Sequence, residues 1–170
     1  MTRAAFLVVA GAGVAAVLAP LALQSRPALL WNATASAPAG LYRVWPATPL
    51  HVGDWVSVRT PVDLAALFAA RQYLPLGVPL VKQVAALPPS EVCRIGRRIS
   101  VDGRAVALAH GNDRLGRPLP VWRGCRRLAE GQVFLLNAAP DSLDSRYFGS
   151  VATTALVGRL TPLWVQGRAR

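Results

Sequence analysis

Lys82 is the only lysine in a chain that also carries eighteen arginines. A guanidinium stays protonated in proteins, whereas a lysine amine can lose its proton when its surroundings lower its pKa. Lys82 lies in the apolar run 78–86, and burial there would favour the neutral amine, which can serve as a general base toward a hydroxyl group. Composition alone leaves a second interpretation open, in which Lys82 is a surface residue whose amine extends into solvent.

Four short segments place hydroxyl, amine, carboxyl and guanidinium groups in a fixed order along the chain. They cover residues 36–42 (SAPAGLY), 80–88 (LVKQVAALP), 99–103 (ISVDG) and 142–149 (SLDSRYFG). A serine hydroxyl is a weak nucleophile until a neighbouring base removes its proton, and a neutral amine can do so without a histidine. Taken alone, Ser36 would be an ordinary loop serine. Its place in this ordered set makes it a candidate nucleophile.

The ordered set resembles the type I signal peptidases, which use a serine–lysine dyad, and it is most similar to their conjugative-transfer branch, the TraF-type peptidases. The resemblance extends from Trp31 to the C-terminus, and Ser-x-Asp-Ser-Arg-x-Phe-Gly is a highly specific piece of it. It implies that Ser36 is the nucleophile and Lys82 the general base. It also implies an oxyanion hole formed by Thr34 and the backbone N–H of Ser36, which would stabilise the transition state.

The same resemblance suggests roles for three residues of the last segment. Ser142 would hydrogen-bond the Lys82 amine and orient it, whereas Asp144 would pair with Arg146 and hold the shape of the segment. A carboxylate too close to the amine would raise its pKa and oppose its use as a base. Many family members carry Gly-Asp-Asn-Arg just before this segment, where this chain reads LNAAPD at 136–141.

The resemblance implies a membrane-anchored serine endopeptidase that removes leader peptides from exported proteins, with no cofactor. Its substrates would be membrane-anchored, pilin-like precursors of a conjugation apparatus. An acyl-enzyme could release its product by hydrolysis or by cyclisation, and the sequence does not show which of the two reactions occurs. Three alternatives stay open: a general type I leader peptidase, a non-catalytic envelope component that retains the fold, and a self-cleaving serine–lysine protein.

The N-terminal residues 4–23 carry no charge and are long enough to cross a bilayer as a helix. Arg3 before them favours a cytoplasmic N-terminus. We therefore predict an anchor over 1–25 and a peptidase domain over 26–170, on the periplasmic side of a bacterial inner membrane. A cleaved secretory signal is the alternative. Only thirteen residues separate this run from the candidate nucleophile, which would lie within about 45 Å of the lipid.

Cys93 and Cys125 are the only cysteines in the chain. In an exported domain such a pair is typical of a disulfide, and two buried free thiols are the alternative. The histidines His51 and His110 are too few and too scattered for a metal site, and there is no CxxC pair. We predict no bound metal.

Positive charge is concentrated in one part of the chain. The net charge is +11, and residues 94–127 hold nine arginines against Asp102 and Asp113. Such a surface suits nucleic acid or an anionic membrane. Aromatic residues are not interleaved with the arginines, and no nucleic-acid motif is recognisable, so we predict no nucleic-acid partner and a solvated basic face beside the headgroups of a lipid bilayer.

Short strands dominate the rest of the pattern. We predict them at 41–45, 54–59, 80–86, 92–95, 98–101 and 132–137, with a hairpin at 101–106 and one or two closing strands within 151–165. One short helix is expected after Thr60, as its cap, with Pro61 in the first position. Residues 109–125 lack a clear period and are expected to leave the sheet.

The predicted fold class is therefore mostly β. It is a signal-peptidase-like antiparallel β barrel or sheet domain with one short helix, preceded by a single N-terminal transmembrane helix.

Overall fold

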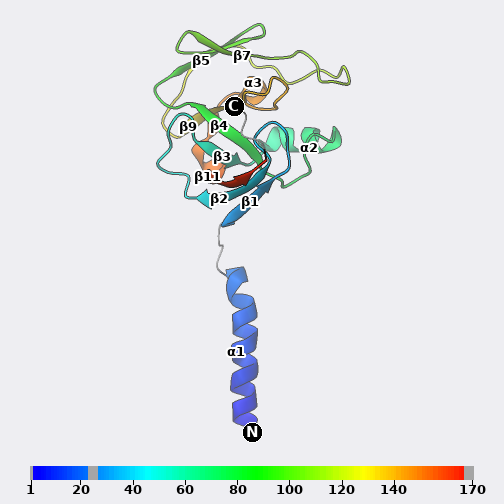
Figure 1. Cartoon of the computed structure of the whole chain (residues 1–170), viewed down its shortest axis with the longest axis vertical. Helices are drawn as coiled ribbons and strands as arrows, with labels where there is room; N and C mark the ends of the chain where they lie inside the picture. Colours follow the sequence, from blue (N-terminus) through cyan, green and yellow to red (C-terminus); the bar gives the residue numbers. More distant parts are fainter. Residues whose placement is uncertain (1, 23–26, 167–170) are drawn as a thin grey trace.

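The computed structural model describes residues 2–22 and 27–166 and consists of an N-terminal helix and a mostly β domain (Figure 1). Helix α1 covers Arg3–Ala22. In these two described ranges, no helix combines the length and the apolar character that crossing a membrane requires. Leu23, the end of the uncharged run, and the predicted boundary between anchor and domain at 25/26 lie outside the described residues.

Seven strands form one antiparallel sheet in the order β1-β2-β11-β3-β4-β9-β10. Their bounds are β1 Leu29–Asn32, β2 Gly40–Trp45, β3 Trp55–Val58, β4 Leu80–Ala86, β9 Gln132–Leu136, β10 Val151–Ala152 and β11 Leu156–Val165. The C-terminal strand β11 pairs with both β2 and β3, so it joins the first part of the chain to β4. Gly40 is required at the start of β2, since its φ is +151° and a Cβ there would lie 2.1 Å from the carbonyl oxygen of Trp164.

Strand β4 lies inside the large sheet, and both of its faces are covered. Side chains alternate between the two faces of a strand. Leu80 and Val84 therefore point into one apolar core, while Val81 points into another, where it packs with Ala37. This alternation places Lys82 on the face of Leu80 and Val84, and it also brings the segment between β1 and β2 against β4.

Four strands form a second, smaller antiparallel sheet in the order β7-β6-β5-β8. They are β5 Glu91–Ile95, β6 Arg98–Val101, β7 Arg104–Leu108 and β8 Gly124–Arg127. The predicted hairpin is present between β6 and β7. Its turn residues Asp102 and Gly103 have φ values of 47° and 78°, the left-handed conformation that Asp-Gly turns adopt.

The arginine-rich part of the chain belongs to this small sheet and its connections. Figure 1 shows β5 and β7 at the end of the domain opposite β1, the strand that follows the N-terminal segment. The arginines at 98, 104, 126 and 127 are exposed there. Their place in the fold does not support the expected position beside lipid headgroups, because the chain enters the domain at its other end.

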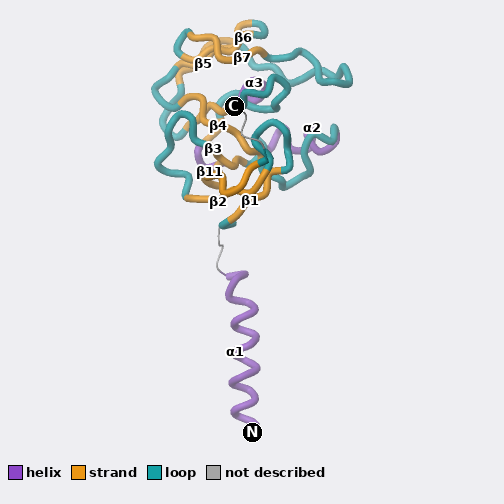
Figure 2. Tube along the Cα trace, in the orientation of Figure 1, coloured by secondary structure: helices purple, strands orange, loops and turns teal. Residues whose placement is uncertain are grey.

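Two short helices flank the large sheet (Figure 2). Helix α2 covers Val62–Ala70 and buries Phe68 in the core. The predicted Thr60 cap is wrong, since Pro61 occupies the N-cap position with an extended ψ of 136° and no side chain caps the helix. Helix α3, Ser145–Phe148, was not predicted, because four residues are too few to show a helical period.

The predicted strands are otherwise confirmed to within one residue at most ends, and the mostly β class is confirmed. Two strands were missed. No strand was predicted at β1, and β8 lies within the segment expected to leave the sheet. Both are only four residues long and are identified by their partners, β2 and β5, rather than by their own pattern.

Candidate active site

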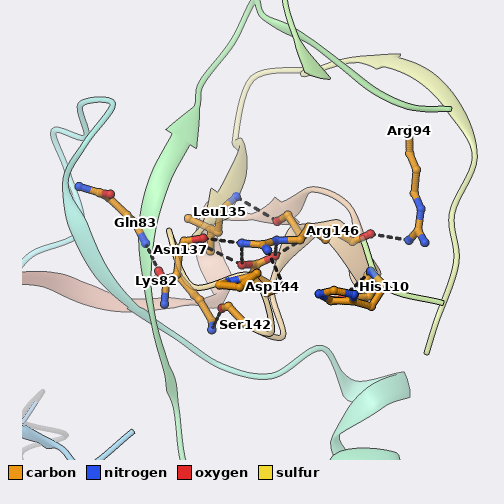
Figure 3. Close-up of polar contacts among 12 residues, drawn as sticks. Lys82, Gln83, Arg94, His110, Leu135, Asn137, Ser142, Asp144 and Arg146 are labelled. Carbon is orange, nitrogen blue, oxygen red and sulfur yellow. Dashed lines mark hydrogen bonds and ion pairs between the residues drawn. The ribbon is translucent and has the colours of Figure 1, made fainter. Parts of the chain in front are cut away.

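The amine of Lys82 lies in the interior of the domain. The residue is 1% exposed, and its Nζ donates a hydrogen bond of 2.7 Å to Ser142 Oγ (Figure 3). Burial lowers the pKa of Lys82 from 10.5 to about 8, an effect that the charge of Asp144 partly opposes and that of Arg146 supports. A substantial fraction of this amine is therefore neutral near pH 8, as a general base requires.

Asn137 fixes the backbone of β4 on both sides of Lys82. Its Nδ2 donates to the carbonyl oxygen of Val81 at 3.1 Å, and its Oδ1 accepts from the N–H of Gln83 at 3.1 Å. Figure 3 shows the side chain of Asn137 beside the strand at the level of the lysine. These two bonds hold the residues that flank the amine.

Asp144 and Arg146 form a buried ion pair behind Ser142. Asp144 is 0% exposed, accepts from Arg146 Nε at 3.0 Å and caps α3 by accepting from the Arg146 N–H at 3.1 Å. The guanidinium also donates to the carbonyl oxygens of Pro140 and Asn137. The carboxylate of Asp144 is thereby paired with a guanidinium. Among the ion pairs of the described residues, none joins it to Lys82.

Ser36 lies in a tight loop between β1 and β2 that is organised by Asn32. The side chain of Asn32 is buried at 4% exposure, and its Nδ2 donates to the carbonyl oxygens of Thr34, Ala37 and Pro38 at 3.1 to 3.2 Å. Its Oδ1 accepts from the Thr34 N–H at 3.1 Å. One amide side chain therefore holds the backbone on both sides of Ser36.

The hydroxyl of Thr34 is also held by Asn32. Because Nδ2 donates to three carbonyls, Oδ1 is the acceptor, and Thr34 Oγ1 donates to it at 2.7 Å. The hydroxyl proton expected to stabilise an oxyanion is thus directed to Asn32 in this structure. For Thr34 to donate to an oxyanion, its hydroxyl must rotate away from this bond.

The predicted serine, lysine and supporting hydroxyls share one cleft. Thr34, Ser36, Lys82 and Ser142 line a cavity of about 290 Å³ whose apolar wall includes Phe68. Within the described part of the chain, no hydrogen bond joins Ser36 to Lys82, and the amine is bonded to Ser142 instead. Asp144 and Arg146 lie behind this cleft and do not line it.

Cys93 and Cys125 are outside the cleft and form a disulfide between β5 and β8, where the strand register places them directly opposite each other. Glu91 lies close enough to both sulfurs for the three residues to form a metal-type cluster. Because both sulfurs are bonded to each other, neither is available as a thiolate ligand.

Asn32 and Asn137 are the site residues that the sequence reasoning missed. Asn32-Ala33-Thr34 resembles a glycosylation acceptor, a weak three-residue pattern that obscures the role of Asn32 in the loop. Asn137 falls in the stretch where the chain departs from the family pattern. A buried side-chain amide that bonds two or more backbone groups is recognisable only once the chain is folded.

Comparison with known proteins shows the family. The model of the family described as signal peptidase, peptidase S26 matches residues 1–164, and the chain belongs to that family. A conjugal transfer protein TraF of Agrobacterium fabrum strain C58 is 35% identical over 145 residues, which cover 78% of this chain and 80% of the relative. A protein of the same name from Agrobacterium tumefaciens strain 15955 is 35% identical over 146 residues, with the same coverage.

A solved structure gives a weaker likeness. The crystal structure of a signal peptidase I from Enterococcus faecalis V583 has 20% sequence identity and a TM-score of 0.41, covering 68% of this chain and 99% of that one. The predicted family, including its TraF branch, is confirmed by the family model and the relatives. Together they support a role like that of a leader peptidase.

Proposed function

We propose that this protein is a serine endopeptidase in which Ser36 is the nucleophile and Lys82 the general base. The observation that carries the proposal is the buried Lys82 amine, with its pKa lowered to about 8, in the same cleft as the Ser36 hydroxyl. The Lys82 amine donates one hydrogen bond to Ser142 Oγ. The other hydrogen-bonding positions of the amine are available to Ser36 or to substrate.

The reaction proceeds through an ester of Ser36. The neutral Lys82 amine removes the Oγ proton as Ser36 attacks the peptide carbonyl, and the N–H of Ser36 donates to the oxyanion. The ammonium of Lys82 then returns a proton to the leaving amine. Water, activated by the same amine, hydrolyses the ester and releases the second product. If an amine of the substrate attacks the ester instead, a new peptide bond closes a ring.

The proposed substrate is a pilin-like precursor anchored in the membrane, by analogy with the conjugal transfer proteins that the chain resembles. Membrane attachment through residues 1–25 belongs to the same proposal. It is supported by an exposed aromatic pair at the end of the domain where the chain arrives, since Trp31 of β1 and Trp164 of β11 stack with ring centroids 5.8 Å apart. Tryptophan is enriched at membrane interfaces.

Co-expression with a candidate pilin precursor, followed by intact-mass measurement, tests the proposal. Hydrolysis removes the mass of the leader, and cyclisation removes one further water. We expect Ser36→Ala and Lys82→Arg each to reduce processing by about 10⁴-fold or more, because the two groups act as a unit. Ser100→Ala, in the small sheet, is the matched control and should process normally. Processing that survives both site variants would leave the enzyme hypothesis without support.

A second function is favoured by one observation. The Thr34 hydroxyl is bonded to Asn32, and no hydrogen bond among the described residues joins Ser36 to Lys82. This arrangement is compatible with a non-catalytic component that binds precursors in the same cleft. A Ser36-directed phosphonate distinguishes the two: an enzyme is labelled at Ser36 in proportion to its activity, and a binding protein is not.

A further inference from the structure

A larger cavity adjoins the cleft that holds Ser36 and Lys82. It has a volume of about 960 Å³ and lies between the end of α2, the segment that follows β7 and the turn before α3. Tyr73, Arg114, Asp141 and Leu143 line both cavities. A polypeptide in the cleft can therefore continue directly into the larger cavity.

One wall of this cavity is a well-ordered turn rather than an open loop. The carboxylate of Asp113 accepts from Arg117 Nε at 2.7 Å, from the N–H groups of Leu115 and Arg117 at 2.9 and 2.8 Å, and from the hydroxyl of Tyr73. These bonds fix the turn at both ends and attach it to Tyr73, three residues after the end of α2. The turn thus presents a fixed surface to a ligand.

The charges on the cavity leave an excess of positive charge. Arg117 is neutralised by Asp113, and Arg114 by Asp141. The guanidinium of Arg71 donates to the carbonyl oxygen of Pro118 at 2.7 Å, and over residues 2–22 and 27–166 no carboxylate pairs with it. An acidic group in the cavity would meet this uncompensated cation.

The boundary between the two cavities is an ion pair that a ligand can replace. The side chains of Arg114 and Asp141 are 87% and 46% exposed, and pairs this exposed contribute little to stability. A carboxylate of a bound polypeptide can exchange with Asp141 as the partner of Arg114 at little cost. Arg71 and Arg114 therefore both face an acidic ligand along the same path.

The position of the cavity gives the direction of the bound chain. Figure 1 shows the segment between β7 and β8 projecting from the end of the domain that lies away from β1. Under the proposed function, the leader of the substrate is its membrane-proximal part and approaches from the side of β1. The residues after the cleaved bond then extend toward the cavity.

We propose that this cavity binds the substrate segment that follows the cleaved bond and that Arg71 and Arg114 make it favour acidic side chains there. This inference rests on the proposed function, because the path of the substrate is taken from it. The ligand class is an extended acidic peptide of a few residues. A volume near 1,000 Å³ is at the upper end of that of ordinary ligand sites.

The test uses the full chain and three fluorescent peptides that share one leader, with small residues before the bond. They carry Glu, Ala or Lys at the second to fourth residues after it. We expect kcat/KM to be about five- to tenfold higher for the Glu peptide than for the Lys peptide, with most of the difference in KM. In Arg71→Ala combined with Arg114→Ala, the ratio should fall to within about twofold.

Two variants control for folding and for general charge effects. Arg71→Lys keeps the positive charge and should retain most of the preference, whereas Arg104→Ala removes an exposed arginine from the small sheet and should leave the ratio unchanged. Equal kcat/KM values for the Glu and Lys peptides, or a preference that persists without Arg71 and Arg114, would overturn the inference while the peptidase assignment stands.

Binding to Ser36→Ala separates this inference from the proposed function. Fluorescence anisotropy of the labelled peptides should show the same five- to tenfold preference for Glu without any cleavage. If the native chain cleaves no peptide but the preference is still found in binding, the peptidase assignment fails and the acidic-peptide site is supported. If Ser36→Ala binds the Glu and Lys peptides equally, the acidic-peptide site is rejected.

Discussion

The two sheets of the domain differ in where they place charge. Around β4 and α3 the domain buries Lys82, Asp144 and Arg146, each at 2% exposure or less. The small sheet buries Arg94 alone among its strand arginines and leaves the others in solvent. It is joined by a disulfide between β5 and β8, whereas the described part of the large sheet has none.

The difference matters because the buried amine used for the proposed chemistry lowers the stability of the domain. Burying an ionised group costs several kcal/mol unless a partner and further hydrogen bonds compensate it. Asp144 and Arg146 compensate each other, but the Lys82 amine has the hydroxyl of Ser142 in place of a carboxylate. The region that carries the proposed site therefore holds a titratable amine at a cost in stability. The buried cation of the small sheet, Arg94, is instead satisfied by donating to the carbonyl oxygens of Gly96, Pro120 and Arg146.

The largest effect is expected at the buried ion pair. Asp144→Ala leaves the Arg146 guanidinium buried without its carboxylate and removes the cap of α3, so we expect the free energy of unfolding to fall by about 3–5 kcal/mol. Asp141→Ala breaks the exposed pair with Arg114 and should cost about 1 kcal/mol or less. Urea unfolding measures both, and equal losses would contradict the proposed difference between the two pairs.

Removal of the disulfide is the next largest change. The bond joins residues 32 positions apart, and we expect Cys93→Ala with Cys125→Ala to lower the free energy of unfolding by about 2–4 kcal/mol. Because the bond lies outside the cleft, the specific activity of the folded protein should stay within about twofold of the native value. Thermal unfolding and peptide cleavage at a temperature where both proteins are folded provide the measurements. A large loss of activity would show that the small sheet supports the site.

Lys82 is expected to reduce stability at neutral pH. Its pKa of about 8 in the folded chain lies below the value of 10.5 for a free lysine, so between these values the unfolded state binds more protons. Stability should therefore rise as the pH increases from 8 to 10.5, by at most about 3 kcal/mol. Lys82→Met should remove this rise and should be the more stable protein below pH 8. Unfolding at pH 7 and pH 10 measures the difference, and parallel pH profiles would refute it.

The same pKa gives an expectation for activity. Only the neutral amine can act as a base, so kcat/KM should increase with pH and level off above about 8. The Asp144→Asn variant, if folded, loses the carboxylate that raises the pKa of Lys82, and its activity profile should shift to lower pH. A profile that is flat from pH 6 to 9 would argue against Lys82 as the base.

A smaller loss of stability than at the disulfide is expected at Asn32. Asn32→Ala removes the donor to three carbonyl oxygens of the Ser36 loop, which should cost about 1–3 kcal/mol. Displacement of the nucleophile should lower kcat by up to about 100-fold with little change in KM. Glu130→Ala changes an exposed residue that lines neither the cleft nor the larger cavity, so it is the control and should change neither stability nor kcat. An unchanged kcat in Asn32→Ala would show that the loop keeps its geometry without this side chain.

The family and much of the strand pattern could be predicted because they depend on local information. The segment SLDSRYFG keeps its residues in a fixed order, and β4 is an apolar run whose bounds match the prediction at both ends. The Asp-Gly turn at 102–103 needs only its own two residues to adopt positive φ. Each of these features is encoded within a few neighbouring positions.

Other features could not be predicted from local patterns. Strand β1 depends on β2, and β8 depends on β5, because neither LLWN nor GCRR alternates apolar and polar residues. The roles of Asn32 and Asn137 depend on which carbonyl groups surround them. The exposed arginines lie where the small sheet lies in the domain. No single segment of the chain specifies the position of that sheet.

The sequence by itself determined the kind of groups available: one lysine, a serine before it and a charged pair after it, in an order that identifies the family. Only the tertiary structure decided that the lysine is buried on the core face of β4, that its amine meets Ser142, and that Asn32 holds both the serine loop and the hydroxyl of Thr34. The physical reason is that residue type and order are local properties. The pKa of an amine and the direction of a hydroxyl proton depend on neighbours brought together from distant parts of the chain.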